Sequence, residues 1–257
     1  MMKSVALLIA LLCLASIAPA ATAAELNYSL YLLAVPLADA TFTLDQSAAA
    51  YRMTMSFHTT GLADLFASDQ LAEHITGRIE NDRLVPYDYG SSSRLRGQDR
   101  LVGLVWRNGT PVATAIVPPN AGEREEVPAS LLPNTIDPLS AIVLMLRQVA
   151  RTGRCDSSAR TYDGRRVSLF EAKTIGEEDL PASHRSSFAG RALRCDFSER
   201  TLAGARIGSG HDEDAKERPG ELWIAPIVPG GPRLPVRATV ATRWFGDATV
   251  YLTSASP

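Results

Sequence analysis

Residues 51–60 read Tyr-Arg-Met-Thr-Met-Ser-Phe-His-Thr-Thr and alternate apolar with polar side chains over most of their length. Tyr51, Met53, Met55 and Phe57 fall on one face of an extended chain, because successive side chains of a strand point to opposite sides. A period of two predicts a β-strand with one buried and one solvated face. The stretch therefore indicates a sheet protein whose apolar face contributes to the interior.

Segments of the same character fill most of the first half of the chain. Asn108-Gly109 separates two of them and is a strong hairpin signal. Residues 61–67 interrupt the pattern and favour a helical turn or two across the end of the sheet. Together the runs predict an antiparallel meander of about seven strands. They are residues 27–33, 40–44, 51–60, 71–80, 84–91, 99–106 and 111–117.

One helix is predicted over residues 138–152. Asp137 is a favourable N-cap, Pro138 suits the first helical position, and Gly153 suits the C-terminal end. Apolar side chains cover most of the circumference of this segment, which predicts burial on more than one side. We therefore expect a mainly β protein, a strongly curved antiparallel sheet or open β-barrel wrapped around this one buried α-helix.

Strand-like segments resume after the helix. Asp163-Gly164 lies between the first two of these segments and is a second type I′ hairpin signal. The charged, Gly-containing stretch 208–218 favours a solvated loop, and the spacing of its acidic residues does not match a calcium loop. The later strands are predicted at residues 158–162, 166–172, 193–202, 220–225, 236–242 and 248–253.

Residues 1–24 have the form of a Sec-type secretory signal peptide. Lys3 precedes an apolar run over 5–18, and small residues follow, with cleavage expected near Ala23 or Ala24. We expect a periplasmic or secreted protein whose mature chain, residues 25–257, is a single domain. No later apolar run is long enough for a transmembrane segment.

Removal of this segment leaves two cysteines, Cys155 and Cys195, in an oxidising compartment. No Cys-x-x-Cys motif is present, so a structural disulfide is a better interpretation than a redox or metal site. A bond between them would close a loop of about 40 residues, which the chain-entropy model values at about 4 kcal/mol.

The composition and motifs assign no chemistry. The net charge of −2 gives no basic face for nucleic acid. The chain has no phosphate-binding loop, no dinucleotide fingerprint and no nucleophile elbow. His58 and His74 lie on strands, but Glu73 and His74 are adjacent and point to opposite faces. We therefore assign no catalytic residue, no metal and no cofactor, and the sequence favours a noncatalytic protein without excluding an enzyme.

The apolar faces of the strand at 51–60 and of the helix indicate a different kind of site. An unfilled space between them would take an apolar or amphipathic envelope component, such as a lipid, although the same side chains suit ordinary packing equally well. One alternative is a hydrolase of envelope polymers that uses His58 or His74. Another is a scaffold that contacts a partner protein through a sheet edge, and the sequence does not identify that partner. The candidate ligand-binding residues are Tyr51, Met53, Met55, Phe57, Ile142 and Met145.

Several short motifs occur in an order that resembles one exported bacterial family, the domain of unknown function 3108. They include Tyr28-Ser29-Leu30-Tyr31, Ile136-Asp137-Pro138-Leu139-Ser140, Tyr162-Asp163-Gly164-Arg165-Arg166 and Leu234-Pro235-Val236. The resemblance implies an envelope protein with a curved antiparallel sheet and an enclosed helix, and it implies no established activity. Its expected shape is similar to that of lipoprotein carriers, so lipid binding follows from it only as a fold analogy.

Overall fold

The computed structural model describes residues 22–66, 68–208, 211, 214, 216–241 and 246–256. Most of the predicted signal peptide, residues 1–21, therefore lies outside the described residues. The elements are β1 Thr22–Leu32, β2 Val35–Gln46, β3 Ala50–Thr59, α1 Gly61–Phe66, β4 Gln70–Glu80, β5 Arg83–Leu95, β6 Gln98–Arg107, β7 Thr110–Val117, a 3-10 turn Ala129–Leu131, α2 Pro138–Thr152, β8 Ser157–Tyr162, β9 Val167–Leu180, β10 Gly190–Ala203, β11 Arg218–Pro226, β12 Arg233–Ala241 and β13 Asp247–Ser256.

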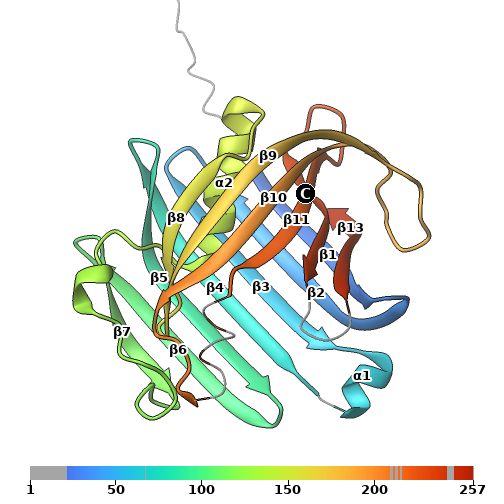
Figure 1. Cartoon of the computed structure of the whole chain (residues 1–257). Helices are drawn as coiled ribbons and strands as arrows, with labels where there is room; N and C mark the ends of the chain where they lie inside the picture. Colours follow the sequence, from blue (N-terminus) through green and yellow to red (C-terminus); the bar gives the residue numbers. More distant parts are fainter. Residues whose placement is uncertain are drawn as a thin grey trace, which may run out of the picture.

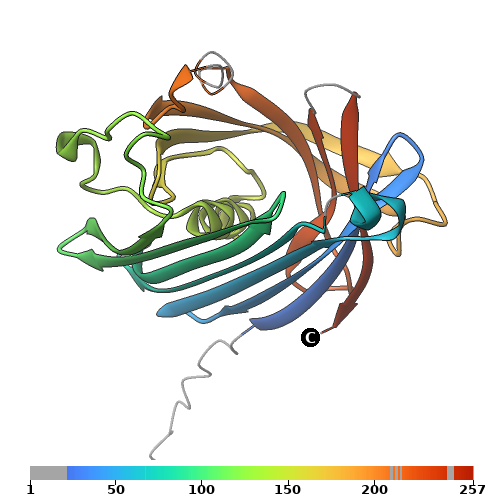
Figure 2. The same cartoon turned by 90° about the horizontal axis from the view of Figure 1, so that it is seen from below.

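The strands form one 13-stranded antiparallel sheet that curves into a nearly closed barrel (Figures 1 and 2). Neighbouring strands are neighbours in sequence, except that β1 pairs with β13 and so joins the two halves of the chain. The sheet begins at β7 and ends at β8, and these two strands do not pair with each other. The predicted class, mainly β with an open antiparallel barrel, is confirmed.

The predicted strand at 51–60 is β3, and it is one of seven strands that precede α2, as the meander requires. The pairing of Phe42 with Met55 and of Met53 with Ile75 keeps the apolar side chains of β2, β3 and β4 on one face. That face is the inner side of the barrel, where Tyr51 and Met53 are buried.

The two hairpin signals have different outcomes. Asn108 and Gly109 both have positive φ, 51° and 74°, as a two-residue hairpin turn requires. The turn at Asp163-Gly164 also occurs as expected, but its type is not I′. Tyr162 pairs with Val167 across four residues, and the Asp163 carboxylate accepts hydrogen bonds from the backbone N–H groups of the next two arginines. An Asp side chain that caps its own turn replaces the two-residue geometry.

Helix α2 has the predicted bounds, and its caps explain them. The Asp137 carboxylate accepts a hydrogen bond from Ser140 N at 2.9 Å, and Gly153 ends the helix at φ 72°. Leu139, Val143 and Val149 are fully buried. The helix lies on the inner side of the sheet (Figure 2) and contacts β8 most extensively, with further contacts to β3, β4, β5 and β12.

The gap between β7 and β8 is closed by the loop that leads into α2. The N–H of Ile136 donates to Arg160 O at 3.0 Å, and Ile136 O accepts from Tyr162 N at 2.8 Å. The Arg165 guanidinium, which is buried, donates to Val117 O at 2.8 Å and to Pro118 O at 3.1 Å. Backbone pairing and one arginine thus connect the two sheet edges.

Gly164 lies in the turn between β8 and β9, beside the gap between β7 and β8, and the neighbouring residues leave no room for a side chain there. Its φ is 86°, and a Cβ there would lie 2.4 Å from Val102 Cγ1. We expect Gly164→Ala to lower the free energy of unfolding by about 2 kcal/mol, through backbone strain and overpacking together. Gly97→Ala is the matched control, because Gly97 has φ 76° but open space around it, and it should cost only about 1 kcal/mol. Equal losses of unfolding free energy in the two variants, measured by urea unfolding, would argue against tight packing around Gly164.

The predicted disulfide is present. Cys155 and Cys195 are bonded with a Cα–Cα distance of 6.3 Å, and both residues are completely buried. Cys155 follows the end of α2 and Cys195 lies within β10, so the bond ties the end of the helix to a strand two places along the sheet from β8.

Candidate functional site

A cavity of about 340 Å³ lies between α2 and the inner face of the sheet. One wall comes from β1, β2 and β3, and the opposite wall comes from β9 to β13. All its lining side chains are apolar except Tyr28, whose hydroxyl donates to Pro235 O at 2.8 Å. The volume falls within the range of small-molecule sites, and an apolar cavity of this kind has no polar group to hold water.

Five of the six predicted ligand-binding residues line this cavity: Met53, Met55, Phe57, Ile142 and Met145. Whether they bind a ligand remains a prediction. The sixth, Tyr51, is not among the lining residues. Its buried hydroxyl instead shares a hydrogen bond of 2.8 Å with Ser140 Oγ.

Tyr51 therefore belongs to a polar chain at the start of α2. Ser140 Oγ donates to the Asp137 carboxylate at 2.5 Å, and burial raises the pKa of Asp137 to about 6. Burial also raises the pKa of the Tyr51 phenol, so it stays a neutral hydrogen-bonding partner. The chain holds the first turn of α2 against β3 and so fixes the distance between helix and sheet across which the cavity extends.

The cavity exists because the barrel is wider than its side chains can fill. Barrels of about eight strands are filled by their own side chains, whereas larger ones enclose space. In this barrel of 13 strands, α2 occupies part of the interior. The remaining space lies beyond Ile142 and Met145, facing the stacked rings of Phe170 and Phe197, whose centroids are 6.4 Å apart.

A half-buried carboxylate lies on the same inner face, next to the cavity wall. Glu73 pairs with Met55 across β3 and β4, and Tyr89 Oη donates to Glu73 Oε1 at 2.8 Å. Burial raises the pKa of Glu73, against the opposing effect of hydrogen bonds from Tyr89 and Ser91. Glu73 was not predicted as an interior residue, although its spacing from Leu71 and Ile75 along the strand places all three on one face.

The histidines required by the hydrolase alternative lie outside the barrel. His74 Nε2 is 3.1 Å from Asp88 Oδ2, in an open hollow of about 600 Å³, and both side chains are about half exposed. Within the described part of the chain, no serine or threonine hydroxyl makes a hydrogen bond to the His74 ring. The pair therefore lacks the nucleophile that a catalytic triad needs, and the hydrolase hypothesis stays untested.

A larger hollow, about 850 Å³, surrounds the start of β4. It shares Phe57 and Leu71 with the apolar cavity, but polar side chains such as His58, Gln70 and Arg94 make up much of its lining. Size alone does not make it the better site, because it lacks a convergent set of buried polar groups.

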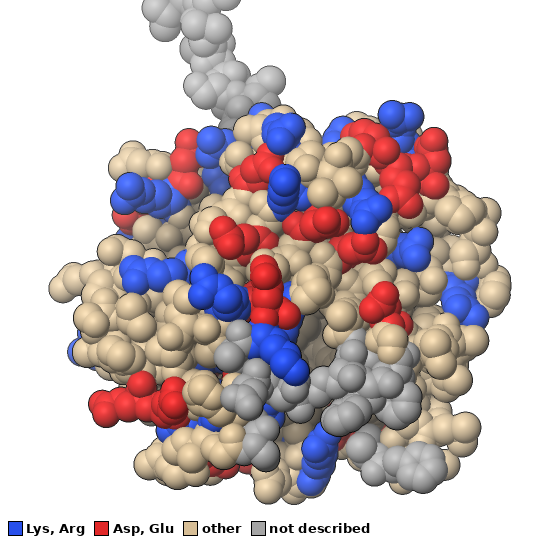
Figure 3. Space-filling model, viewed as in Figure 1, with Lys and Arg blue, Asp and Glu red and all other residues tan. Residues whose placement is uncertain are grey.

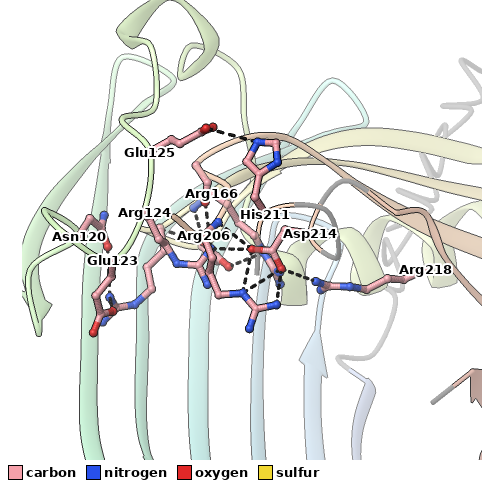
Figure 4. A network of polar contacts seen from close by, with 12 residues as sticks. Asn120, Glu123, Arg124, Glu125, Arg166, Arg206, His211, Asp214 and Arg218 are labelled. Atoms are coloured by element: carbon pink, nitrogen blue, oxygen red, sulfur yellow. Dashed lines mark hydrogen bonds and ion pairs between the residues drawn. The ribbon is translucent and has the colours of Figure 1, made fainter. Parts of the chain in front are cut away.

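A charged network gathers around the Asp214 carboxylate (Figure 4). The Asp214 carboxylate, with 1% of its surface exposed, lies 2.8 Å from Arg206, 3.2 Å from Arg218 and 3.5 Å from Arg124. Burial alone would raise the pKa of Asp214, but the hydrogen bonds from Arg206 and the charges of Arg206 and Arg124 outweigh it and lower the pKa. The prediction that residues 208–218 form a solvated loop is wrong for Asp214, because Arg206 and Arg218 from the two ends of this segment and Arg124 from a distant one enclose its carboxylate.

Elsewhere, charges of both signs are mixed. Figure 3 shows acidic and basic side chains interspersed over the face formed by β8 to β11. Pairs such as Arg191 with Glu177, 3.6 Å apart, contribute to this pattern. Among the described residues, no cluster of three His, Cys, Asp or Glu is placed to hold a metal ion, and no helix is long and apolar enough to cross a membrane.

One solved structure places the architecture among known folds. The crystal structure of a β-barrel-like protein of domain of unknown function DUF1849 from Brucella abortus superposes with a TM-score of 0.56 at 12% sequence identity. The match covers 91% of this chain and 97% of that one. At this identity the likeness establishes the fold alone.

The sequence comparisons identify the family. A search of curated proteins finds no match. A family model described as "Protein of unknown function (DUF3108)" matches residues 27–253, which include α1, α2 and almost every strand of the barrel. The chain therefore belongs to the DUF3108 family.

Proposed function

We propose that this protein is an exported, noncatalytic envelope protein that holds an apolar or lipid-like ligand between α2 and the inner face of its barrel. The observation that carries the proposal is the cavity, which is unfilled and almost entirely carbon-lined. The form of residues 1–24 supports export to the periplasm or the exterior.

The physical basis of binding is the removal of apolar surface from water. Each buried CH₂ group of a ligand is worth about 0.8 kcal/mol. Met53, Met55 and Met145 line the cavity and are flexible, polarisable side chains, which adapt to chains of different shape. The site should therefore select ligands by their apolar volume, because the only polar lining residue, Tyr28, already donates its hydroxyl proton within the barrel.

The direct test fills the cavity. Ala40 lines it, so Ala40→Trp should occupy the space that a ligand needs. We expect delipidated wild-type protein to bind a fluorescent fatty acid, and Ala40→Trp to bind it about tenfold or more weakly. Native mass spectrometry of gently purified protein should show an apolar molecule on the wild type that is depleted on this variant.

Ala72→Trp is the matched control. Ala72 lies on β4 with its side chain on the outer face, since Leu71 beside it lines the cavity. This variant should bind the fatty acid like the wild type. Equal affinity of Ala40→Trp and the wild type would overturn the proposal, as would equal weakening by both variants.

A further inference from the structure

Four exposed aliphatic side chains gather at the barrel end that carries the β1–β2 hairpin and α1. Leu33, Leu62 and Leu65 are 76%, 67% and 79% exposed, and Val35 is 48% exposed. We call these four residues the apolar rim. Figures 1 and 2 both show the hairpin and α1 side by side, and Thr60 N donates to Leu37 O at 2.8 Å between the two segments.

The hairpin tip is unusual for a turn in water. Residues 26–38 contain no charged side chain, whereas the β4–β5 and β6–β7 turns of the same chain use Asn81-Asp82 and Asn108-Gly109. Leu33 has φ 57°, a left-handed conformation that ordinarily belongs to Gly or Asn. The strained backbone and the exposed apolar side chain of Leu33 both cost free energy, and such costs tend to occur at functional surfaces.

Within α1, the charged side chain beside the rim leucines is Asp64, and its carboxylate is already hydrogen-bonded within the protein. Asp64 Oδ1 accepts hydrogen bonds from Thr59 Oγ1 at 3.0 Å and from Ser68 Oγ at 2.9 Å. The carboxylate thus bonds to residues before and after α1. Leu62 precedes Asp64 in the helix and Leu65 follows it, and both leucines are exposed. The short helix therefore presents leucines where an isolated surface helix would present polar groups.

The rim adjoins the apolar cavity. Leu30, Phe57 and Leu71 line that cavity, and they lie within a few residues of the hairpin tip, of the start of α1 and of the segment that follows α1. The rim thus lies at the β1–β4 side of the barrel end that the cavity wall reaches.

A cation and two tyrosines flank the hairpin. The Arg185 guanidinium lies 4.9 Å from the centre of the Tyr31 ring, and Tyr31 meets Tyr251 edge-on at 5.8 Å. Tyrosines and cations beside aliphatic side chains are the combination found at the boundary between headgroups and acyl chains.

From these observations we infer that the apolar rim docks on the surface of a lipid bilayer, with its leucines inserted at the acyl boundary. A protein partner or second copy would need a broad, complementary face, whereas the rim is only four aliphatic side chains on two short neighbouring protrusions, three of them at least 67% exposed. A fluid acyl phase accepts such isolated protrusions. The inference goes beyond the proposed function, because docking depends on the tips and not on the cavity.

The test is flotation of the purified protein with vesicles of phosphatidylethanolamine and phosphatidylglycerol. We expect the wild type to float, and the triple variant Leu33→Glu, Leu62→Glu, Leu65→Glu to partition about tenfold or more weakly. Leu65→Glu alone should give an intermediate loss. A wild type that stays in solution, or a triple variant that floats equally well, would overturn the inference.

Two controls separate docking from cavity binding and from loss of structure. Ile175→Glu with Val228→Glu replaces residues that are 49% and 58% exposed outside the rim, and it should float like the wild type. Ala40→Trp should also float, and the triple variant should still bind the fluorescent fatty acid. Equal loss of flotation in the Ile175 and Val228 variant would show a general charge effect and overturn the assignment to the rim.

Discussion

Replacing Cys155 and Cys195 together by alanine is expected to lower the free energy of unfolding by about 4 kcal/mol. The two residues are 40 positions apart, and the bond restricts the unfolded chain over the whole segment from the end of α2 to the middle of β10. Urea unfolding of the oxidised wild type and of the double variant at the same pH measures the difference.

The wild type under reducing conditions is the matched comparison, because it keeps both side chains and loses only the bond. Its loss should approach that of the double variant. A change of less than about 1 kcal/mol in both would contradict the view that the bond constrains the unfolded chain.

Asp214→Asn is expected to lower the free energy of unfolding by about 3 kcal/mol at neutral pH. The substitution keeps the shape of the side chain but leaves Arg206, Arg218 and Arg124 without their buried counter-charge. Asp99→Asn is the control: Asp99 pairs with Arg94, the side chains are 72% and 59% exposed, and solvent screens such a pair, so this variant should unfold like the wild type.

The pH dependence of this effect has a definite sign. The hydrogen bonds and charges of Arg206 and the charge of Arg124 hold the pKa of Asp214 in the folded protein below its ordinary value. Its stabilising contribution is therefore complete above that value and is lost as the pH falls through the lower, folded-state pKa. The gap between wild type and Asp214→Asn should shrink in acid, and a gap that widens there would contradict the assignment of a charged, paired carboxylate.

The elements with a local signal were predictable. The alternation at 51–60 predicts β3, and Asp137, Pro138 and Gly153 predict both ends of α2, because caps and periodicity act within a few residues. The closure of the barrel through β1 and β13 could not be predicted, because no local pattern near Tyr28 indicates that this residue pairs with Leu252. Pairing between the ends of a chain depends on the whole sheet.

In the candidate site too, residues with a local sequence signal were predictable and residues placed by long-range strand pairing were not. Met53, Met55 and Phe57 were identified from their shared face, whereas Phe170 and Phe197 on the opposite wall come from strands whose approach to β3 is set by barrel closure. The burial of Asp214 was missed for a related reason: the segment folds back so that Arg206 and Arg218 meet the carboxylate, and Arg124 joins them from a distant segment, which local composition does not show.

The central claim, that an apolar ligand occupies the interior between α2 and β3, is tested most directly by photolabelling. A fatty acid with a photoactivatable group along its chain would be bound to delipidated protein, irradiated, and the modified peptides mapped by mass spectrometry. We predict labels on peptides that contain Met55 and Ile142, both of which line the cavity. Labels confined to outward-facing residues such as Ala72 and His74, or no saturable labelling, would contradict the account.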